Sequence, residues 1–121
     1  MPTEASADSL AALTARVLRH RDERDWGQFH TPKELAISLC VESAELLSLM
    51  QWKTGQELIR SLAAKHDKVR DELADVFHSL LLLSSDLKVD LAAALEQKLA
   101  KDAAKYPVEK AKGKNLKYTE L

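Results

Sequence analysis

Two pairs of acidic residues are the residues of this chain best suited to chemistry. Glu42 and Glu45 form the first pair, and Glu72 and Asp75 form the second. An α-helix turns by about 300° over three residues, so both carboxylates of a pair project from one face of a helix. Burying ionised carboxylates without a cation is costly. Because hard ions prefer oxygen ligands, we expect all four side chains to bind Mg²⁺, for which Mn²⁺ would be a substitute.

The neighbours of the acidic pairs favour a metal site over an ordinary solvated helix face. Solvated acids usually alternate with Lys or Arg along a helix. Here, by contrast, small or apolar residues flank both pairs, namely Val41, Ser43, Ala44, Leu46, Ala74, Val76 and Phe77. The sequence therefore predicts a four-carboxylate cluster formed by two helices.

His78 leaves a second kind of metal site open, because it follows Asp75 at i, i+3 spacing. Di-iron bundles use such a carboxylate and histidine pair on each of two helices. The chain has one Asp-x-x-His and no second pair, so we favour magnesium. We expect His78 to be a core or interface histidine.

Composition excludes several classes of function. The chain has 121 residues, 18 basic and 19 acidic, with a net charge of −1. No overall charge therefore draws it to a nucleic acid polymer or to an anionic membrane. The one cysteine, Cys40, follows Leu39 in an apolar stretch, so we expect a buried thiol and no disulfide. With no basic and apolar leader and no run of about 20 apolar residues, we expect a cytoplasmic protein.

The elements that position the acidic pairs are all expected to be helices, because no strand-like alternation occurs. A first amphipathic helix is expected from Asp8 to about residue 21. Thr31, Pro32 and Glu34 have the form of a capping box, so a second helix is expected from Pro32 to about residue 51.

Two further helices complete the expected bundle. Thr54 repeats the capping pattern and opens a helix to about residue 85, or two helices broken at 65–68. Asp90 is expected to cap a last helix that ends before Pro107 and turns its leucines 91, 95 and 99 inward. The sequence predicts one all-α domain over residues 1–121, a four-helix bundle with flexible or partner-covered segments at 1–7 and about 108–121.

The second helix also predicts self-association. It is apolar almost all round, apart from the two glutamates, and such a helix is buried on more than one side. A chain of 121 residues has too little protein to cover it. We therefore expect a homodimer or homotetramer.

Aromatic and basic residues suggest what the metal would act on. Aromatic side chains lie beside hydrogen-bonding groups near helix ends, at Trp26, Gln28, Phe29, His30, Trp52 and Tyr106. Each aromatic residue could be a simple core filler, but flat rings with a few polar groups also suit a nucleobase. Lys98, Lys101 and Lys105 share a helix face, which is either solvated or able to hold phosphate.

Several of these motifs together resemble one family. Glu-x-x-Glu followed by Glu-x-x-Asp resembles the all-α nucleotide pyrophosphohydrolases of the MazG-like superfamily. The segments RDWGQFHTP at 24–32, QW at 51–52, ELADV at 72–76 and KYPVEKAKGKNLKYTEL at 105–121 are similar to its dCTP pyrophosphatase branch. The resemblance covers about residues 16–121.

The resemblance implies a four-helix protomer that assembles as a dimer or tetramer and hydrolyses a nucleoside triphosphate to a monophosphate and pyrophosphate with Mg²⁺. It implies metal ligation by the four acids, with Glu45 as the catalytic base. It also places Trp26, Gln28, Phe29, His30 and Trp52 around the base and sugar, and Lys98, Lys101 and Tyr106 near the phosphates.

Three positions depart from the family pattern. Ser79 stands where relatives often have Tyr, Asp102 where Asn is usual, and Val17 where some have His. A carboxylate at Asp102 would repel phosphate unless a metal or a nearby lysine offsets it. The resemblance thus implies a hydrolase that removes nucleotides from the cellular pool, with dCTP or a modified dCTP as substrate. The alternative is a non-catalytic helical module that binds a nucleotide or metal.

Overall fold

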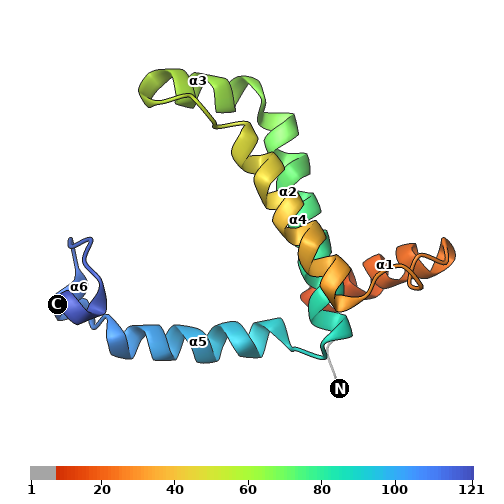
Figure 1. Cartoon of the computed structure of the whole chain (residues 1–121). Coiled ribbons are helices and arrows are strands. Elements are labelled where there is room, and N and C mark those ends of the chain that lie inside the picture. The colour runs from red at the N-terminus through yellow and green to blue at the C-terminus, as the bar shows by residue number, and fades with distance from the viewer. Residues whose placement is uncertain (1–7) are drawn as a thin grey trace. The chain divides into compact units, whose positions relative to one another are not determined.

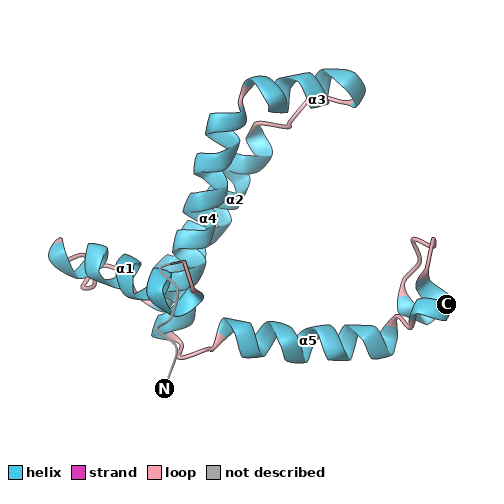
Figure 2. Cartoon of the chain, turned by 180° about the vertical axis from the view of Figure 1, so that it is seen from behind, coloured by secondary structure: helices cyan, strands magenta, loops and turns pink. Residues whose placement is uncertain are grey.

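The protein consists of helices joined by short turns (Figures 1 and 2). The computed structural model describes residues 8–121, and this part of the chain contains no strand. The all-α prediction is therefore confirmed. The lead-in expected at residues 1–7 lies outside the described residues. No described helix is both long and apolar enough to cross a membrane.

The chain divides into two compact units, residues 1–88 and 89–121. The first holds α1 (Leu10–Glu23), α2 (Pro32–Ser48), α3 (Gly55–Ala64) and α4 (His66–Asp86). The second holds α5 (Leu91–Lys105), α6 (Val108–Ala111) and a 3-10 turn, η1 (Tyr118–Glu120). A single domain over the whole chain stays a prediction.

In the first unit α2 and α4 lie side by side and run in opposite directions, while α1 packs on α4 (Figure 1). Leu35 lies near the start of α2, and Leu81 and Leu82 lie near the end of α4. Antiparallel packing brings these ends together, and all three leucines are buried. The core of the unit therefore lies where α2 and α4 meet, at the end of the pair that receives α1.

Side-chain caps explain where two helices of this unit begin. Ser9 accepts a hydrogen bond from the Ala12 amide at 3.1 Å, and Thr31 accepts one from the Glu34 amide at 3.3 Å. The prediction that the Thr54 side chain caps the next helix is wrong. Thr54 precedes α3, but its side chain makes no capping hydrogen bond.

The sequence left open whether one helix or two helices follow Thr54, and the observed boundaries decide this. Lys65 ends α3 and precedes α4, so the version with two helices is confirmed. Helix α2 ends at Ser48, earlier than expected, and the chain then turns through Trp52, whose φ is 69°. A non-glycine residue rarely adopts that backbone conformation, so the turn at Trp52 is a strained one.

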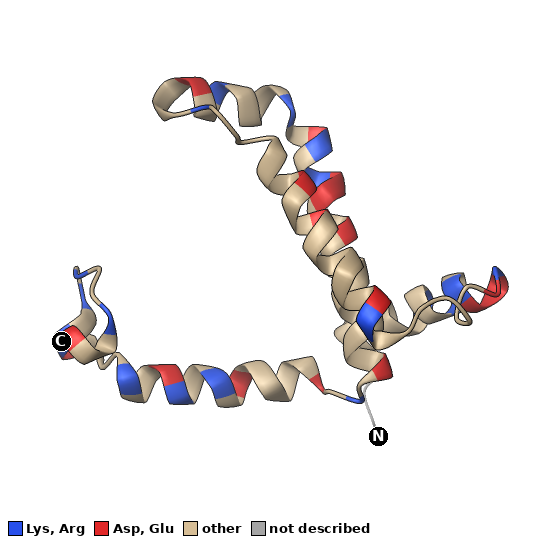
Figure 3. Ribbon diagram, viewed as in Figure 1, with Lys and Arg blue, Asp and Glu red and all other residues tan. Residues whose placement is uncertain are grey.

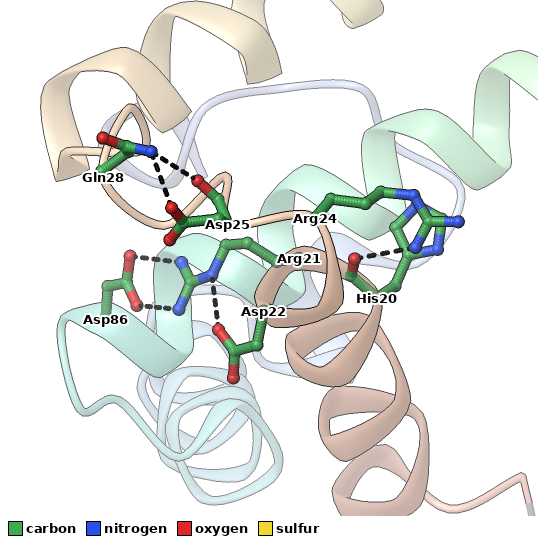
Figure 4. A network of polar contacts seen from close by, with 7 residues as sticks. All are labelled: His20, Arg21, Asp22, Arg24, Asp25, Gln28 and Asp86. Carbon is green, nitrogen blue, oxygen red and sulfur yellow. Dashed lines mark hydrogen bonds and ion pairs between the residues drawn. The ribbon is translucent and has the colours of Figure 1, made fainter.

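One ion pair joins α1 to α4 (Figure 4). The guanidinium of Arg21 donates two hydrogen bonds to the carboxylate of Asp86, at 2.9 and 3.2 Å. Both side chains are largely shielded from water, with 13% and 22% of their surface exposed. Two-point contacts of this kind fix geometry as well as distance. The pair therefore sets the position of α1, and of the loop after it, against α4.

Much apolar surface of α2 and α4 stays uncovered. Val41 and Leu47 on α2, and Leu73 and Phe77 on α4, are exposed. The prediction of a buried Cys40 is wrong, because its thiol is exposed on α2. Helix α2 is apolar almost all round, as its sequence indicates, but within one chain only one side of the helix is covered.

In the second unit Asp90 caps α5 as predicted, accepting from the Ala93 amide at 3.0 Å. The expectation that leucines 95 and 99 face inward is wrong, since both are exposed in a unit with no helix packed along that face. The tail after Pro107 forms α6 and η1, and the Tyr118 ring packs edge-on to Tyr106 with centroids 6.0 Å apart.

Candidate active site

The packing of α2 against α4 brings acidic side chains from both helices together. Glu42 and Glu45 project from α2, and Glu72 projects from α4. Each offers a carboxylate oxygen, and the three oxygens lie within 4.8 Å of one another. Figure 3 shows acidic positions at the same level on the two helices. Within residues 8–121 no other group of three or more acids, histidines or cysteines is as close.

The electrostatics of this cluster are unfavourable without a cation. Burial raises the pKa of Glu42 to about 7, helped by contact with Glu45 and by the charges of Asp75 and Glu72. Burial also raises the pKa of Glu72, and the charge of Glu45 adds to the effect. Each carboxylate disfavours ionisation of its neighbours. The folded chain therefore holds negative charge here that it does not itself neutralise.

Two carboxylate oxygens of the cluster have no partner within the described chain. Glu42 Oε2 and Glu72 Oε2 are buried and make no hydrogen bond there. Buried polar atoms are nearly always paired in folded proteins. A divalent cation with oxygen ligands would satisfy both atoms at once. The residues present thus fit a hard metal ion. A di-iron site would also require histidine ligands, and no histidine belongs to this cluster.

Asp75, the fourth predicted ligand, takes a different place. It is exposed and lies outside the group of three. It lines a pocket together with Glu42, and its charge contributes to the raised pKa of Glu42. The structure therefore brings three of the four acids together and leaves Asp75 beside them.

The pocket next to the cluster has a volume of about 170 Å³. Helices α1, α2 and α4 and the loop after α1 form its wall. Its polar lining residues, besides Glu42 and Asp75, are His20, Arg21, Trp26, His30, Ser38, His78 and Ser79. Leu35 and Leu82 of the buried core contribute its apolar part. Carboxylates at one side and an aromatic ring in the wall suit a ligand with both an anionic and a flat, polar part.

Residues 37–121 match the sequence profile of the MazG-like family. The chain belongs to the MazG-like family. Both acidic pairs fall within the matched residues. A solved structure of similar fold, a pyrophosphatase from Archaeoglobus fulgidus, superposes with a TM-score of 0.81 at 32% identity, over 88% of this chain and 98% of that one.

Curated relatives of this MazG-like chain carry a more specific name. Human dCTP pyrophosphatase 1 is 38% identical over 101 residues, which are 82% of this chain and 59% of that protein. Bovine dCTP pyrophosphatase 1 is 36% identical over 101 residues, 82% of this chain and 60% of that protein. The chain thus spans about three fifths of the length of the curated relatives it matches.

Of the residues predicted to surround the base, Trp26 and His30 line the pocket, and Ser79, which stands where relatives often have Tyr, lines it as well. Gln28 does not line it, because its amide donates instead to the backbone and carboxylate of Asp25, both at 3.0 Å (Figure 4). Phe29 also lies outside, with 64% of its surface exposed.

Trp52 is 90% exposed and lies at the other end of α2, next to α3. A tryptophan this exposed contacts little of its own chain. Substrate contact by Gln28, Phe29 and Trp52 stays a prediction.

The residues predicted near the phosphates belong to the second unit. Lys98, Lys101 and Asp102 lie on α5, and Tyr106 is the residue at its end. Lys98 and Asp102 form an ion pair one turn apart. A lysine therefore offsets the carboxylate at the position where the family usually has Asn. The role of these four residues in binding stays a prediction.

Three polar residues of the pocket were not predicted from the sequence, and a fourth was predicted to have another role. His20, Arg21 and Ser38 line the pocket, and His78 lines it as well. His78 carried a signal, its i, i+3 spacing from Asp75, which places both on one face of α4. His20 and Arg21 carried none, because they come close to His78 only after α1 packs on α4.

Proposed function

We propose that the chain hydrolyses a deoxynucleoside triphosphate to the monophosphate and pyrophosphate, with dCTP or a modified dCTP as its substrate. The observation that carries this proposal is the carboxylate cluster of Glu42, Glu45 and Glu72, whose two unpartnered buried oxygens lie beside an aromatic pocket. The names of the relatives support the choice of substrate. They concern proteins longer than this chain, so the activity here needs its own test.

Glu42, Glu45 and Glu72 would hold the divalent cation, with Asp75 as a further ligand. Four oxygen ligands favour Mg²⁺, and Mn²⁺ would substitute for it. When bound, the ion would neutralise charge on the triphosphate and make a water molecule easier to deprotonate. The raised pKa values of Glu42 and Glu72 support this assignment, because a cation would offset both the burial and the repulsion that raise them.

The remaining steps are assigned to residues of the chain. Glu45 is the most exposed of the three clustered acids, which supports its role as the base that would accept a proton from the water that attacks the α-phosphorus. Trp26 in the pocket wall offers an aromatic face to the base, an interaction worth about 1–3 kcal/mol. Lys98, Lys101 and Tyr106 would bind the β- and γ-phosphates, which leave together as pyrophosphate when their bond to the α-phosphorus breaks.

We also propose that the protein works as a homodimer or homotetramer. The exposed apolar side chains of α2 and α4 support this, among them Val41, Leu47, Leu73 and Phe77. Isolated monomers rarely expose so many apolar residues on one pair of helices. Light scattering coupled to size-exclusion chromatography gives the number of subunits directly.

The test of the proposed reaction is pyrophosphate release from purified protein with each of the four dNTPs and 5-methyl-dCTP, in Mg²⁺ and in EDTA. We expect release with Mg²⁺ and not in EDTA, fastest from dCTP or 5-methyl-dCTP. If no nucleotide is hydrolysed but dCTP still binds, the protein is the non-catalytic nucleotide-binding module that the sequence left open.

A further inference from the structure

Two histidines of the pocket have no role in the proposed reaction. His20 comes from α1 and His78 from α4, and their rings meet edge to face with centroids 5.9 Å apart. The ring of His20 also lies 5.9 Å from Trp26, again at a steep angle. Two imidazoles and an indole, from three parts of the chain, thus form one continuous wall of the pocket.

The nitrogens of both imidazoles are available to a ligand. Within residues 8–121 neither ring donates or accepts a hydrogen bond, although polar groups lie all around them. A neutral imidazole carries one N–H donor and one acceptor lone pair. Burial lowers the pKa of His78, and the charge of His20 adds to this, which favours the neutral ring. The His78 ring therefore offers a donor and an acceptor, and the His20 ring beside it adds two further ring nitrogens.

The pocket is small compared with most ligand sites. Its volume of about 170 Å³ is below the range of roughly 300–1,000 Å³ that drug-sized ligands occupy. A one-ring pyrimidine, the base of the proposed substrate, takes up less of this space than a two-ring purine. A pyrimidine also presents an adjacent donor and acceptor on one edge, at N3 and at the group on C4.

Building on the proposed function, we propose that His20 and His78 are specificity-determining residues that hydrogen-bond the N3 and C4 edge of a pyrimidine base. In cytosine N3 accepts and the 4-amino group donates, whereas in uracil these roles are exchanged. A neutral imidazole can move its proton between its two nitrogens and so match either edge. The pocket thus admits 4-amino and 4-oxo pyrimidine nucleotides alike.

The test is equilibrium dialysis of the full chain against radiolabelled dCMP, dUMP, dAMP and dGMP in the presence of Mg²⁺. Monophosphates carry the base and have no pyrophosphate to lose, so the result does not depend on turnover. His20→Phe and His78→Phe keep an aromatic ring in the wall and remove its hydrogen bonds. His66→Phe is the matched control, because His66 is exposed at the start of α4, away from the pocket.

We expect dCMP and dUMP to bind the wild-type protein within about threefold of each other and more tightly than the purines. Each pocket variant weakens both pyrimidines by about tenfold, the loss expected for one hydrogen bond, and the control does not. His20→Phe alters an exposed position of α1, so it carries the test even if His78→Phe does not fold.

Three results would overturn the proposal: tighter binding of purines, wild-type binding of dCMP without dUMP, or variants that bind like the wild type. Failure of the proposed hydrolase function gives a different result. In that case the dialysis pattern is as expected and dCTP is bound but not hydrolysed.

Discussion

The two units of this chain handle charge in opposite ways. In the first unit, packing of α2 on α4 draws Glu42, Glu45 and Glu72 together and shields two of their oxygens from water. In the second unit, Lys98 and Asp102 pair one turn apart on α5, with 60% and 43% of their side chains exposed. Charges of one sign are therefore concentrated at the α2 and α4 cluster of the first unit, whereas opposite charges on α5 of the second unit cancel locally.

This difference separates a functional arrangement from an ordinary helix surface. An exposed i, i+4 ion pair adds a few tenths of a kcal/mol and needs nothing outside its own helix. A desolvated acidic cluster opposes folding until a cation binds, so its presence calls for a ligand. If the comparison holds, substitutions in the cluster change activity and metal response, whereas substitutions in the α5 pair change neither folding nor metal response appreciably.

The largest expected effect is on catalysis. Glu45→Ala or Asp75→Ala should lower kcat/KM for dCTP by about 100-fold or more, because each removes a proposed metal ligand and Glu45→Ala also removes the proposed base. Steady-state pyrophosphate release measures the loss. Circular dichroism should show unchanged helicity.

Glu57→Ala is the control for these two variants, since Glu57 is an exposed acid on α3 outside the cluster. Its activity should match the wild type. Full activity in either Glu45→Ala or Asp75→Ala would remove that residue from the mechanism.

The next effect compares one ion pair from each unit. Asp86→Ala should lower the free energy of unfolding by about 2 kcal/mol, because Arg21 is then left shielded and without its main partner. Asp102→Ala should change it by less than about 0.5 kcal/mol, since Lys98 is exposed to water. Urea denaturation followed by circular dichroism measures both, and equal losses would contradict the contrast between the units.

The acidic cluster should also give the metal-free protein an unusual pH dependence. Glu42 keeps its proton up to about pH 7 when folded, against an ordinary pKa of 4.5. Between these values the folded state binds more protons than the unfolded state, so the free energy of unfolding falls as pH rises. We expect a loss of about 1–2 kcal/mol, less than the full shift implies because water screens the cluster.

Urea titrations in EDTA at several pH values from 4.5 to 7.5 measure this loss. Glu42→Gln should flatten the slope, and Mg²⁺ should restore stability mainly at the upper end of the range. Glu34→Gln, on the same helix but outside the cluster, should keep the wild-type slope. Stability that rises with pH in the wild type would refute the assignment.

Much of this site could be predicted from the sequence, because its parts are local. Spacing alone puts Glu42 and Glu45 on one face of a helix, and the apolar neighbours indicated that the face is shielded. The predictions that were wrong or missing concern contacts that only tertiary packing creates. Cys40 was expected to be buried, but no part of the chain covers its side of α2. His20 and His78 are far apart in sequence, and only the packing of α1 on α4 joins them.

Two threonines, Thr31 and Thr54, also show that the sequence alone does not reveal which contacts form. Their substitution gives the smallest of the predicted effects on stability. The sequence predicted caps at Thr31 and Thr54, yet only Thr31 makes the hydrogen bond. Thr31→Ala should therefore cost about 1 kcal/mol of unfolding free energy, and Thr54→Ala only a few tenths. Thr54 is the matched control, since both residues precede a helix in the same unit. Equal costs in urea denaturation would mean that Thr54 also caps its helix in solution.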